Sequence, residues 1–218
     1  MNNDRAYGGE SRAVRVERRR QAFLDAALEV FGTVGYRKAT VKSLCRQAQL
    51  ADRYFYESFD TLEDLLVAAY QAQVEGMRAC LLAAHASVSP SASSLEMVEA
   101  CLRALYTLVR DPRIARLVWL EVLGVSPRVD HLYAATLQDF ATLLLSLSKS
   151  REPDWSLPPG TERMLGLSLV GAVSEAVQHW LIGGYADDVE SLVDASLIVF
   201  EGVLQVLHRR HQPGQSAA

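Results

Sequence analysis

Residues 40–66 read TVKSLCRQAQLADRYFYESFDTLEDLL, and this stretch decides the fold. Its apolar side chains recur every three or four residues, which predicts helices rather than strands. The pattern predicts a helix over residues 41–48, a turn at Gln49 and Leu50, and a second helix over residues 52–59. A longer helix is expected to follow directly. Two short helices joined by a tight turn are typical of a helix-turn-helix, whose second helix enters the major groove of DNA.

The flanking residues extend this reading in both directions. Upstream, apolar residues spaced by three and four predict a helix from about Val14 to Val34, and Gly35 suits its C-terminus. Thr40 is a good N-cap for the helix that follows. Thr61 with Asp64 has the spacing of a capping box, which predicts the start of a long helix that reaches about residue 87.

The rest of the chain also shows helical periodicity, interrupted by turn-forming residues. Breaks fall at 87–94, at Ser126-Pro127 and in the loop 149–160, which contains three prolines. Between the breaks the pattern predicts helices over residues 95–109, 111–123, 129–147, 161–182 and 187–208. No alternating strand pattern occurs, so the sequence predicts an all-α protein of about nine helices.

Charge is distributed unevenly along the 218 residues. Residues 1–60 carry 11 Lys and Arg against 8 Asp and Glu, a net charge of +3, whereas the remainder carries 11 against 18, a net charge of −7. Five arginines lie between Arg12 and Arg20. This charge distribution predicts that any polyanion binds residues 1–60 and that the acidic remainder of the chain faces away from the polyanion.

Cysteine usage and hydropathy limit the class of protein. Cys45, Cys80 and Cys101 are widely spaced and form no CxxC pair, which argues against a disulfide framework or a zinc site. We expect free thiols, no metal and no cofactor. Polar residues interrupt the most apolar stretch, 164–185, before it reaches the roughly 18 residues of a membrane span. No apolar run follows the N-terminal basic residues, so we expect a cytoplasmic protein without a signal peptide or a membrane partner.

The second short helix carries the side chains expected to read DNA bases. Arg53 and Tyr54 lie in its first turn, and an arginine that grips guanine through two hydrogen bonds contributes about 1–3 kcal/mol of discrimination. Asp52 is expected to stabilise the helix N-terminus through the helix dipole rather than to contact a base. Phe55 is expected in the core. The two flanking tyrosines cannot both be buried on so short a helix.

The remaining contacts are expected at phosphates. The candidates are Thr40, Lys42, Tyr56 and Ser58, with further contacts from the arginine-rich arm, represented by Arg15 and Arg19 among Arg12, Arg15, Arg18, Arg19 and Arg20. Taken alone, a run of arginines is more often a solvated helix face. The order of three helices, the short turn and the basic arm together favour double-stranded DNA as the partner.

Residues 31–66 resemble the DNA-binding region of the tetracycline-repressor-type (TetR) family of bacterial transcriptional regulators. The family pattern is kept without a gap at Phe31, Gly35, Tyr36, Ala39, Thr40, Val41, Leu44, Cys45, Ala48, Leu50, Phe55, Tyr56, Phe59 and Leu65. Four positions depart from it. Gln49 replaces the usual turn glycine, Ala51 the usual Ser or Thr cap, Tyr54 a small residue, and Leu62 a lysine. The departures are expected to change the operator and the affinity but not the fold.

The resemblance implies a homodimer, joined through the last two helices as a four-helix bundle. The sequence is compatible, since Gly166 and Gly171 allow close approach to the helix over 161–182, and the helix over 187–208 is apolar on more than one side. The residues expected in the interface are Leu169, Ala172, Val173, Ala176, Phe200, Val203 and Leu207. Two reading helices one DNA turn apart also imply a near-palindromic operator.

The resemblance further implies a ligand cavity within the helices of the back part. The candidates to line it are Tyr106, Trp119, Leu123, His131, Tyr133, Phe140, Glu175, His179 and Trp180. An aromatic residue at helical spacing is more often plain core, so each of these has that alternative role. Glu175 and His179, four residues apart, form either a ligand-orienting pair or a surface interaction on one helix.

The predicted organisation has a disordered arm (1–13), a helix-turn-helix domain (14–60), a helical ligand-binding and dimerisation domain (61–210) and a disordered tail (211–218). The predicted function is a dimeric transcriptional regulator, a repressor released from its operator by a small apolar or aromatic effector. One alternative is a DNA-binding protein without a small-molecule ligand, controlled by a protein partner. Another is an all-α enzyme, against which stands the lack of a nucleophile–base or paired-carboxylate cluster.

Overall fold

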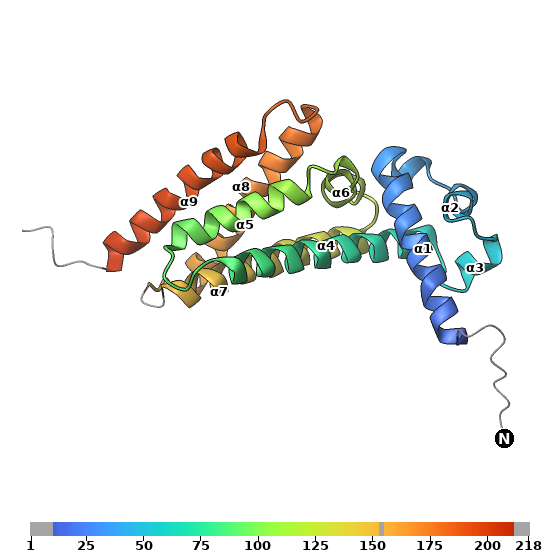
Figure 1. Ribbon diagram of the computed structural model, residues 1–218, viewed down its shortest axis with the longest axis horizontal. Coiled ribbons are helices and arrows are strands. Elements are labelled where there is room, and N and C mark those ends of the chain that lie inside the picture. Colours follow the sequence, from blue (N-terminus) through green and yellow to red (C-terminus); the bar gives the residue numbers. More distant parts are fainter. Residues whose placement is uncertain (1–10, 153–154, 212–218) are drawn as a thin grey trace, which may run out of the picture.

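The protein is described by a computed structural model that covers residues 11–152 and 155–211. Within these residues the chain forms nine α-helices, two short segments of other helical types and no strand, which confirms the all-α prediction (Figure 1). The helices are α1 (Arg12–Thr33), α2 (Val41–Ala48), α3 (Asp52–Tyr56), α4 (Leu62–Ser87), α5 (Ser94–Leu108), α6 (Pro112–Arg116), α7 (Pro127–Arg151), α8 (Pro159–Ile182) and α9 (Val189–His211). The shorter segments are the 3₁₀ helix η1 (Tyr36–Lys38) and the π-helical turn η2 (Leu117–Glu121).

Three boundaries differ from the sequence expectation. Helix α1 begins at Arg12, because the Ser11 side chain accepts the Val14 N–H and caps the helix. Helix α3 ends at Tyr56 rather than at residue 59, since the Ser58 N–H bonds the Phe55 carbonyl at 2.9 Å and tightens the chain into a turn. The single helix expected over residues 111–123 is α6 followed by η2. The arm over residues 1–10 and the tail from 212 lie outside the described residues.

An aromatic cluster holds the first three helices together. Phe23 of α1 meets Phe55 of α3 edge-on at 5.6 Å between ring centroids, and Phe59 lies 6.4 Å from Phe23. These three rings and Leu44 of α2 are buried. Because aromatic side chains bury large apolar areas, this small core is sufficient to fix the orientation of α2 and α3 on α1.

Helix α4 connects this unit to the larger helical part. The Thr61 and Asp64 side chains form the predicted capping box at its start. From there α4 packs against α1 at one end and against α5 and α7 along its length. Figure 1 shows α5, α7, α8 and α9 gathered along α4, with the small unit of α1, α2 and α3 at the opposite end from the C-terminus of α9.

Helix α8 is the one helix in the described ranges that is long and apolar enough to cross a membrane. This is weak evidence of a span, because core helices pass the same test. Here α8 packs against α7, α9 and α6. It also supplies Leu165, Leu169 and Val173 to an internal cavity. Its apolar composition therefore has an explanation within the fold.

Candidate functional site

The turn between α2 and α3 is tight and depends on one unusual backbone conformation. Gln49, the C-cap of α2, has φ 55° and ψ 39°, the left-handed region that glycine occupies most easily. The Leu50 N–H bonds the Cys45 carbonyl at 3.0 Å and closes the turn. Ala51, the N-cap of α3, makes no side-chain hydrogen bond. The two departures noted in the sequence are therefore accommodated without a change of geometry.

The first turn of α3 presents a stacked array of three side chains. The Tyr54 ring lies between two guanidinium groups, with Arg19 at 4.3 Å and Arg53 at 4.6 Å from its centroid. An Arg53 nitrogen also donates to the Tyr54 hydroxyl at 2.6 Å. Arg53 is exposed and Tyr54 is half-buried. The array places an oriented, solvent-facing arginine at the start of α3, the geometry that base readout by an arginine would need.

The arginine-rich segment has a role in holding α3. Arg19 forms an ion pair with Glu57 at 3.0 Å, and its side chain is only 21% exposed. Arg20 donates to the Ser58 carbonyl at 3.3 Å and stacks over Phe59 at 4.6 Å. Of the predicted phosphate contacts in the arm, Arg19 is thus engaged within the protein. Arg15 is half-buried and lies one helical turn before it.

The other predicted DNA contacts divide by exposure. Lys42, Asp52 and Tyr56 are exposed, and Tyr56 retains 61% of its accessible surface. The Thr40 hydroxyl caps α2 by accepting a hydrogen bond from the Ser43 N–H at 3.1 Å. The Thr40 residue nevertheless remains exposed to solvent.

Ser58 is half-buried in the turn after α3. Sequence reasoning missed Arg46, which is exposed four residues after Lys42 on the same face of α2.

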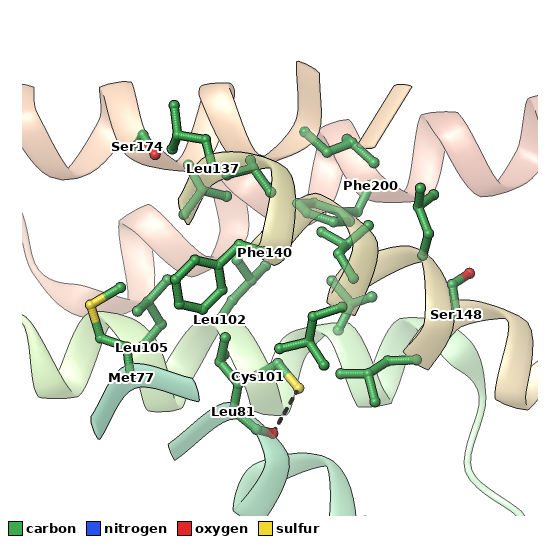
Figure 2. Close-up of a pocket in the computed structure, with 18 of the residues that line it drawn as sticks. Met77, Leu81, Cys101, Leu102, Leu105, Leu137, Phe140, Ser148, Ser174 and Phe200 are labelled. Carbon is green, nitrogen blue, oxygen red and sulfur yellow. Dashed lines mark hydrogen bonds between the residues drawn. The ribbon is translucent and has the colours of Figure 1, made fainter. Parts of the chain in front are cut away.

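An apolar cavity of about 150 Å³ lies inside the larger helical part. Side chains from α4, α5, η2, α7, α8 and α9 line it, together with Trp155. In Figure 2, Met77 and Leu105 lie on one side of the open space, Ser148 on the other, and the Phe140 ring between them. The lining is almost entirely leucine, valine, methionine and aromatic carbon. Cavities of this size and character stay dry and accept apolar guests.

Three of the nine predicted ligand-binding residues line this cavity, namely Trp119, Tyr133 and Phe140. The other six lie elsewhere. Tyr106 is buried and bonds the Ser196 hydroxyl at 2.7 Å. The buried Trp180 meets Tyr185 edge-on at 4.5 Å between ring centroids, so both Tyr106 and Trp180 belong to the core.

Leu123 and His131 are exposed, as are Glu175 and His179, which pair at 3.4 Å on the surface of α8. Sequence reasoning missed most of the lining, because a leucine or methionine facing a cavity has the same helical spacing as one in the core. Only the packing of neighbouring helices separates the two environments.

A carboxylate connects the cavity wall to the DNA-binding unit. Glu121, at the end of η2, accepts the Tyr36 backbone N–H at 2.7 Å and the Arg116 Nε–H at 2.7 Å. Its side chain is only 12% exposed. Gly35 has φ +95°, and a Cβ there would lie 3.1 Å from Glu121 Oε2. Two residues before Glu121, Trp119 lines the cavity.

A second connection runs from α6 to α1. Arg113 pairs with Glu29 of α1 at 2.8 Å and with Asp111 at 2.6 Å. Beside this pair a Cβ on Gly32 would approach the Arg113 Cβ to 2.5 Å, so the two helices touch at backbone distance. Because α6 and η2 form one continuous segment, displacement of Trp119 would be transmitted to α1 and η1 through both connections.

The outer face of α8 and α9 carries exposed apolar groups. Ile198 is 72% exposed, Val199 46% and Val206 40% on α9, and Met164 is 51% exposed on α8. The seven predicted interface residues divide between this face and the interior. Leu169, Phe200 and Leu207 are buried, and Val173 and Val203 line the cavity. Ala172 is exposed and Ala176 is half-buried.

The described residues hold no group of three or more His, Cys, Asp or Glu side chains that could bind a metal. Cys45, Cys80 and Cys101 are free thiols. Burial raises the pKa of Cys45 and of Cys101 to about 11, so both are thiols at neutral pH. Where the chain is described, we find no arrangement suited to metal or thiolate chemistry.

Residues 23–69 match the family model described as "Bacterial regulatory proteins, tetR family". This segment is therefore a TetR-family domain. Its exposed α3, carried on α1 and α2, is therefore the DNA-binding element of a transcriptional regulator. The match begins at Phe23 and ends at Ala69, so it spans the aromatic cluster, the turn at Gln49 and the first part of α4.

Relatives resemble most of the chain, including the part beyond the family match. The fatty acid metabolism regulator protein of Bacillus subtilis (strain 168) is 22% identical over 189 residues, covering 86% of this chain and 94% of its own. The fatty acid degradation regulator FadR of Bacillus halodurans has a TM-score of 0.72 at 19% identity, with 83% and 93% covered. FadR of Bacillus subtilis, solved in complex with stearoyl-CoA, has a TM-score of 0.70 at 19% identity, with 82% and 96% covered. At these identities the structural likenesses establish the fold.

Proposed function

We propose that the protein is a dimeric, ligand-responsive repressor, which binds a near-palindromic operator through α3 and releases it when a ligand occupies the cavity. One observation carries this proposal: the short segment that contributes Trp119 to the cavity also contributes Glu121, which holds Tyr36 of the DNA-binding unit. A ligand that displaces the segment would change the orientation of α1 and, with it, of the recognition helix. The protein would act in the cytoplasm.

The ligand we propose carries a long acyl chain. The cavity offers apolar carbon from six helical elements, and two similar proteins are named as regulators of fatty acid metabolism or degradation. FadR of Bacillus subtilis was solved with stearoyl-CoA. A volume of about 150 Å³ is small for such a chain, so its binding must displace lining side chains. Leucine and methionine rotamers allow this displacement, and it supplies the force on η2.

Dimerisation is proposed through α8 and α9. Four large apolar side chains are exposed there, Met164 on α8 and Ile198, Val199 and Val206 on α9, alongside the small residues Ala172, Ala195 and Gly202. Small residues let helices from two protomers approach closely, and the apolar groups would be removed from water. The second copy of this chain is the occupant that gives two recognition helices on one operator.

The DNA-binding part of the proposal is tested by two substitutions with different expected signatures. Operators selected from random DNA by the wild-type protein provide the reference. Arg53→Ala is expected to relax the preference at one or two base pairs, with a loss of about 1–3 kcal/mol in discrimination. Lys42→Ala is expected to weaken binding evenly across sequences and to lower the salt slope by about one unit. Identical behaviour of both variants would contradict these roles.

The ligand-binding part is tested by filling the cavity. Stearoyl-CoA is expected to release the wild-type protein from its operator in a gel-shift titration, whereas Leu137→Trp should bind the operator but not respond, because the added ring occupies the cavity. Leu123→Trp is the matched control, since Leu123 is exposed and does not line the cavity. An unresponsive wild-type protein would favour control by a protein partner instead.

The coupling is tested at Glu121. Glu121→Gln weakens the acceptor that holds Tyr36 and leaves Arg116 without its charged partner. We expect unchanged affinity for stearoyl-CoA but a loss of about 0.5–2 kcal/mol in the coupling between ligand and operator, measured from operator affinity with and without ligand. Glu75→Gln is the control, because Glu75 forms only an exposed pair with Arg78 within α4. Equal effects of both changes would exclude Glu121 as the link.

A further inference from the structure

The cavity contains few polar atoms, and two of them lack a partner. Among the described residues, four buried side-chain nitrogen or oxygen atoms make no hydrogen bond, and those of Tyr70 and Trp155 belong to side chains that line the cavity. Tyr70 is 1% exposed and Trp155 4% exposed. An unpartnered buried donor destabilises the unliganded protein, and a ligand that supplies an acceptor removes this penalty.

These two residues mark opposite ends of the cavity. Arg128, at the start of α7, pairs with Asp64 at 2.7 Å, which fixes this end of α7 beside the start of α4 and the DNA-binding unit. Arg151, at the other end of α7, donates to the Ser89 carbonyl at 2.8 Å in the connection between α4 and α5. Tyr70, in the first half of α4, therefore lies toward the DNA-binding unit, and Trp155, which follows α7, lies at the far end.

The environments of the two donors differ. Beside Tyr70 lies the Thr136 hydroxyl, and the neighbouring Tyr133 has a raised pKa through burial and the carboxylate of Glu175. That end offers hydroxyl groups, whereas Glu175 itself lies exposed on the surface of α8. Trp155 has no oxygen partner for its indole N–H within the described chain. Instead the Lys149 ammonium lies 4.9 Å from the centre of its ring.

A cation lies beside Trp155. The Lys149 ammonium faces the ring of Trp155 and also pairs with Glu162 at 2.7 Å. Arg209 and Arg210 are exposed just beyond Leu207, which lines the cavity. The positive charge of Lys149 next to a buried N–H donor favours an anionic oxygen at this end.

We propose, given the proposed acyl-responsive function, that the acyl ligand binds with its head group at Trp155 and Lys149. Its methyl end then points toward Trp119. The indole N–H donates to a carboxylate or thioester oxygen of the head, and Lys149 supplies the charge. From Ser148 to Tyr133 the cavity follows α7 for about 22 Å at 1.5 Å per residue. An extended long acyl chain can span this distance. The length of the acyl chain therefore decides whether its methyl end reaches and displaces η2.

The orientation is tested with brominated stearate, since bromine quenches tryptophan fluorescence only at close range. The protein has three tryptophans, Trp119, Trp155 and Trp180. Replacing two of them by phenylalanine leaves one reporter, either Trp155 or Trp119. Bromine next to the carboxylate is expected to quench Trp155 and not Trp119. Bromine at the methyl end should do the opposite. The reverse pattern would overturn the proposed orientation while leaving the acyl-responsive function intact.

Affinities measured by calorimetry provide the second readout. Trp155→Phe is expected to weaken stearate binding about tenfold, through loss of one hydrogen bond to a charged group. Lys149→Met should weaken stearate but not methyl stearate, which lacks the charge, and Tyr70→Phe serves as the control at the other end. Unchanged stearate affinity in Trp155→Phe would refute the head-group site. Failure of the wild-type protein to bind any acyl probe would overturn both proposals.

The head group could belong to an acyl thioester or to a free fatty acid. Binding of stearoyl-CoA and of free stearate distinguishes these two ligands. If the thioester is the ligand, Arg209→Ala and Arg210→Ala are expected to weaken stearoyl-CoA severalfold and to leave stearate unchanged, because only the thioester carries phosphates that reach these exposed cations. If the free acid is the ligand, stearate should bind more tightly and neither arginine should matter. This comparison identifies the ligand, whereas the Trp155→Phe measurement decides the position of its head group.

Discussion

A chain with Ile198→Glu and Val199→Glu is expected to be monomeric at micromolar concentration and to bind its operator at least about 100-fold more weakly. Both side chains lie on the outer face of α9, 72% and 46% exposed, where two carboxylates would face their own copies across the proposed interface. Linking two recognition helices raises the apparent affinity by about 10² to 10⁴, and a monomer loses this gain.

Sedimentation velocity would report the oligomeric state, and fluorescence anisotropy the operator affinity. The protomer itself should remain folded, since surface substitutions of this kind usually change stability by no more than about 0.5 kcal/mol. Leu82→Glu is the matched control, because Leu82 is 43% exposed on α4, away from α8 and α9. A dimer that survives both glutamates would place the interface on another surface of the molecule.

Phe55→Ala is expected to lower the free energy of unfolding of the DNA-binding unit by about 3–5 kcal/mol. Phe55 is fully buried and contacts both Phe23 and Phe59. Because α3 has only five residues, it has little stability of its own and depends on this anchor. Operator binding should be lost, whereas binding of acyl ligands in the cavity should persist.

Hydrogen exchange resolved by segment would test this outcome. Fast exchange should be confined to α1, α2 and α3, and the amides of α5, α7 and α8 should stay protected. Tyr56→Ala is the control, because Tyr56 follows Phe55 but is 61% exposed. That variant should keep the wild-type stability and lose only operator affinity. Uniform destabilisation by Phe55→Ala would show that the two parts unfold as one unit.

The two halves of the molecule are linked by charged groups that are distant in sequence. Glu121 holds Tyr36, 85 residues before it, and Arg113 holds Glu29, 84 residues before it. Glu121, which accepts, and Arg113, which donates, both lie on the helical segment between α5 and α7, beside the wall that Trp119 contributes to the cavity. The same segment contains the π-helical turn, a geometry that often occurs at functional positions.

Local sequence was sufficient for the helices and for the DNA-binding element. The capping residues Thr40 and Thr61 and the three-to-four spacing of apolar groups are short-range signals, so they predict where helices begin. The recognition helix was predictable for the same reason, since Arg53 and Phe55 face opposite sides of a single helical turn. Its length was not, because the turn after Tyr56 is set by the packing of Phe59 on Phe23.

The cavity, the linking carboxylate and the outer face depended on tertiary structure. Trp119 and Trp180 have similar surroundings in sequence, yet one lines the cavity and the other is core. On α9, Phe200 points inward and Val199 outward, and the sequence marks both only as apolar. The physical reason is that periodicity identifies a face of a helix, whereas the neighbouring helices determine whether that face meets core, cavity or solvent.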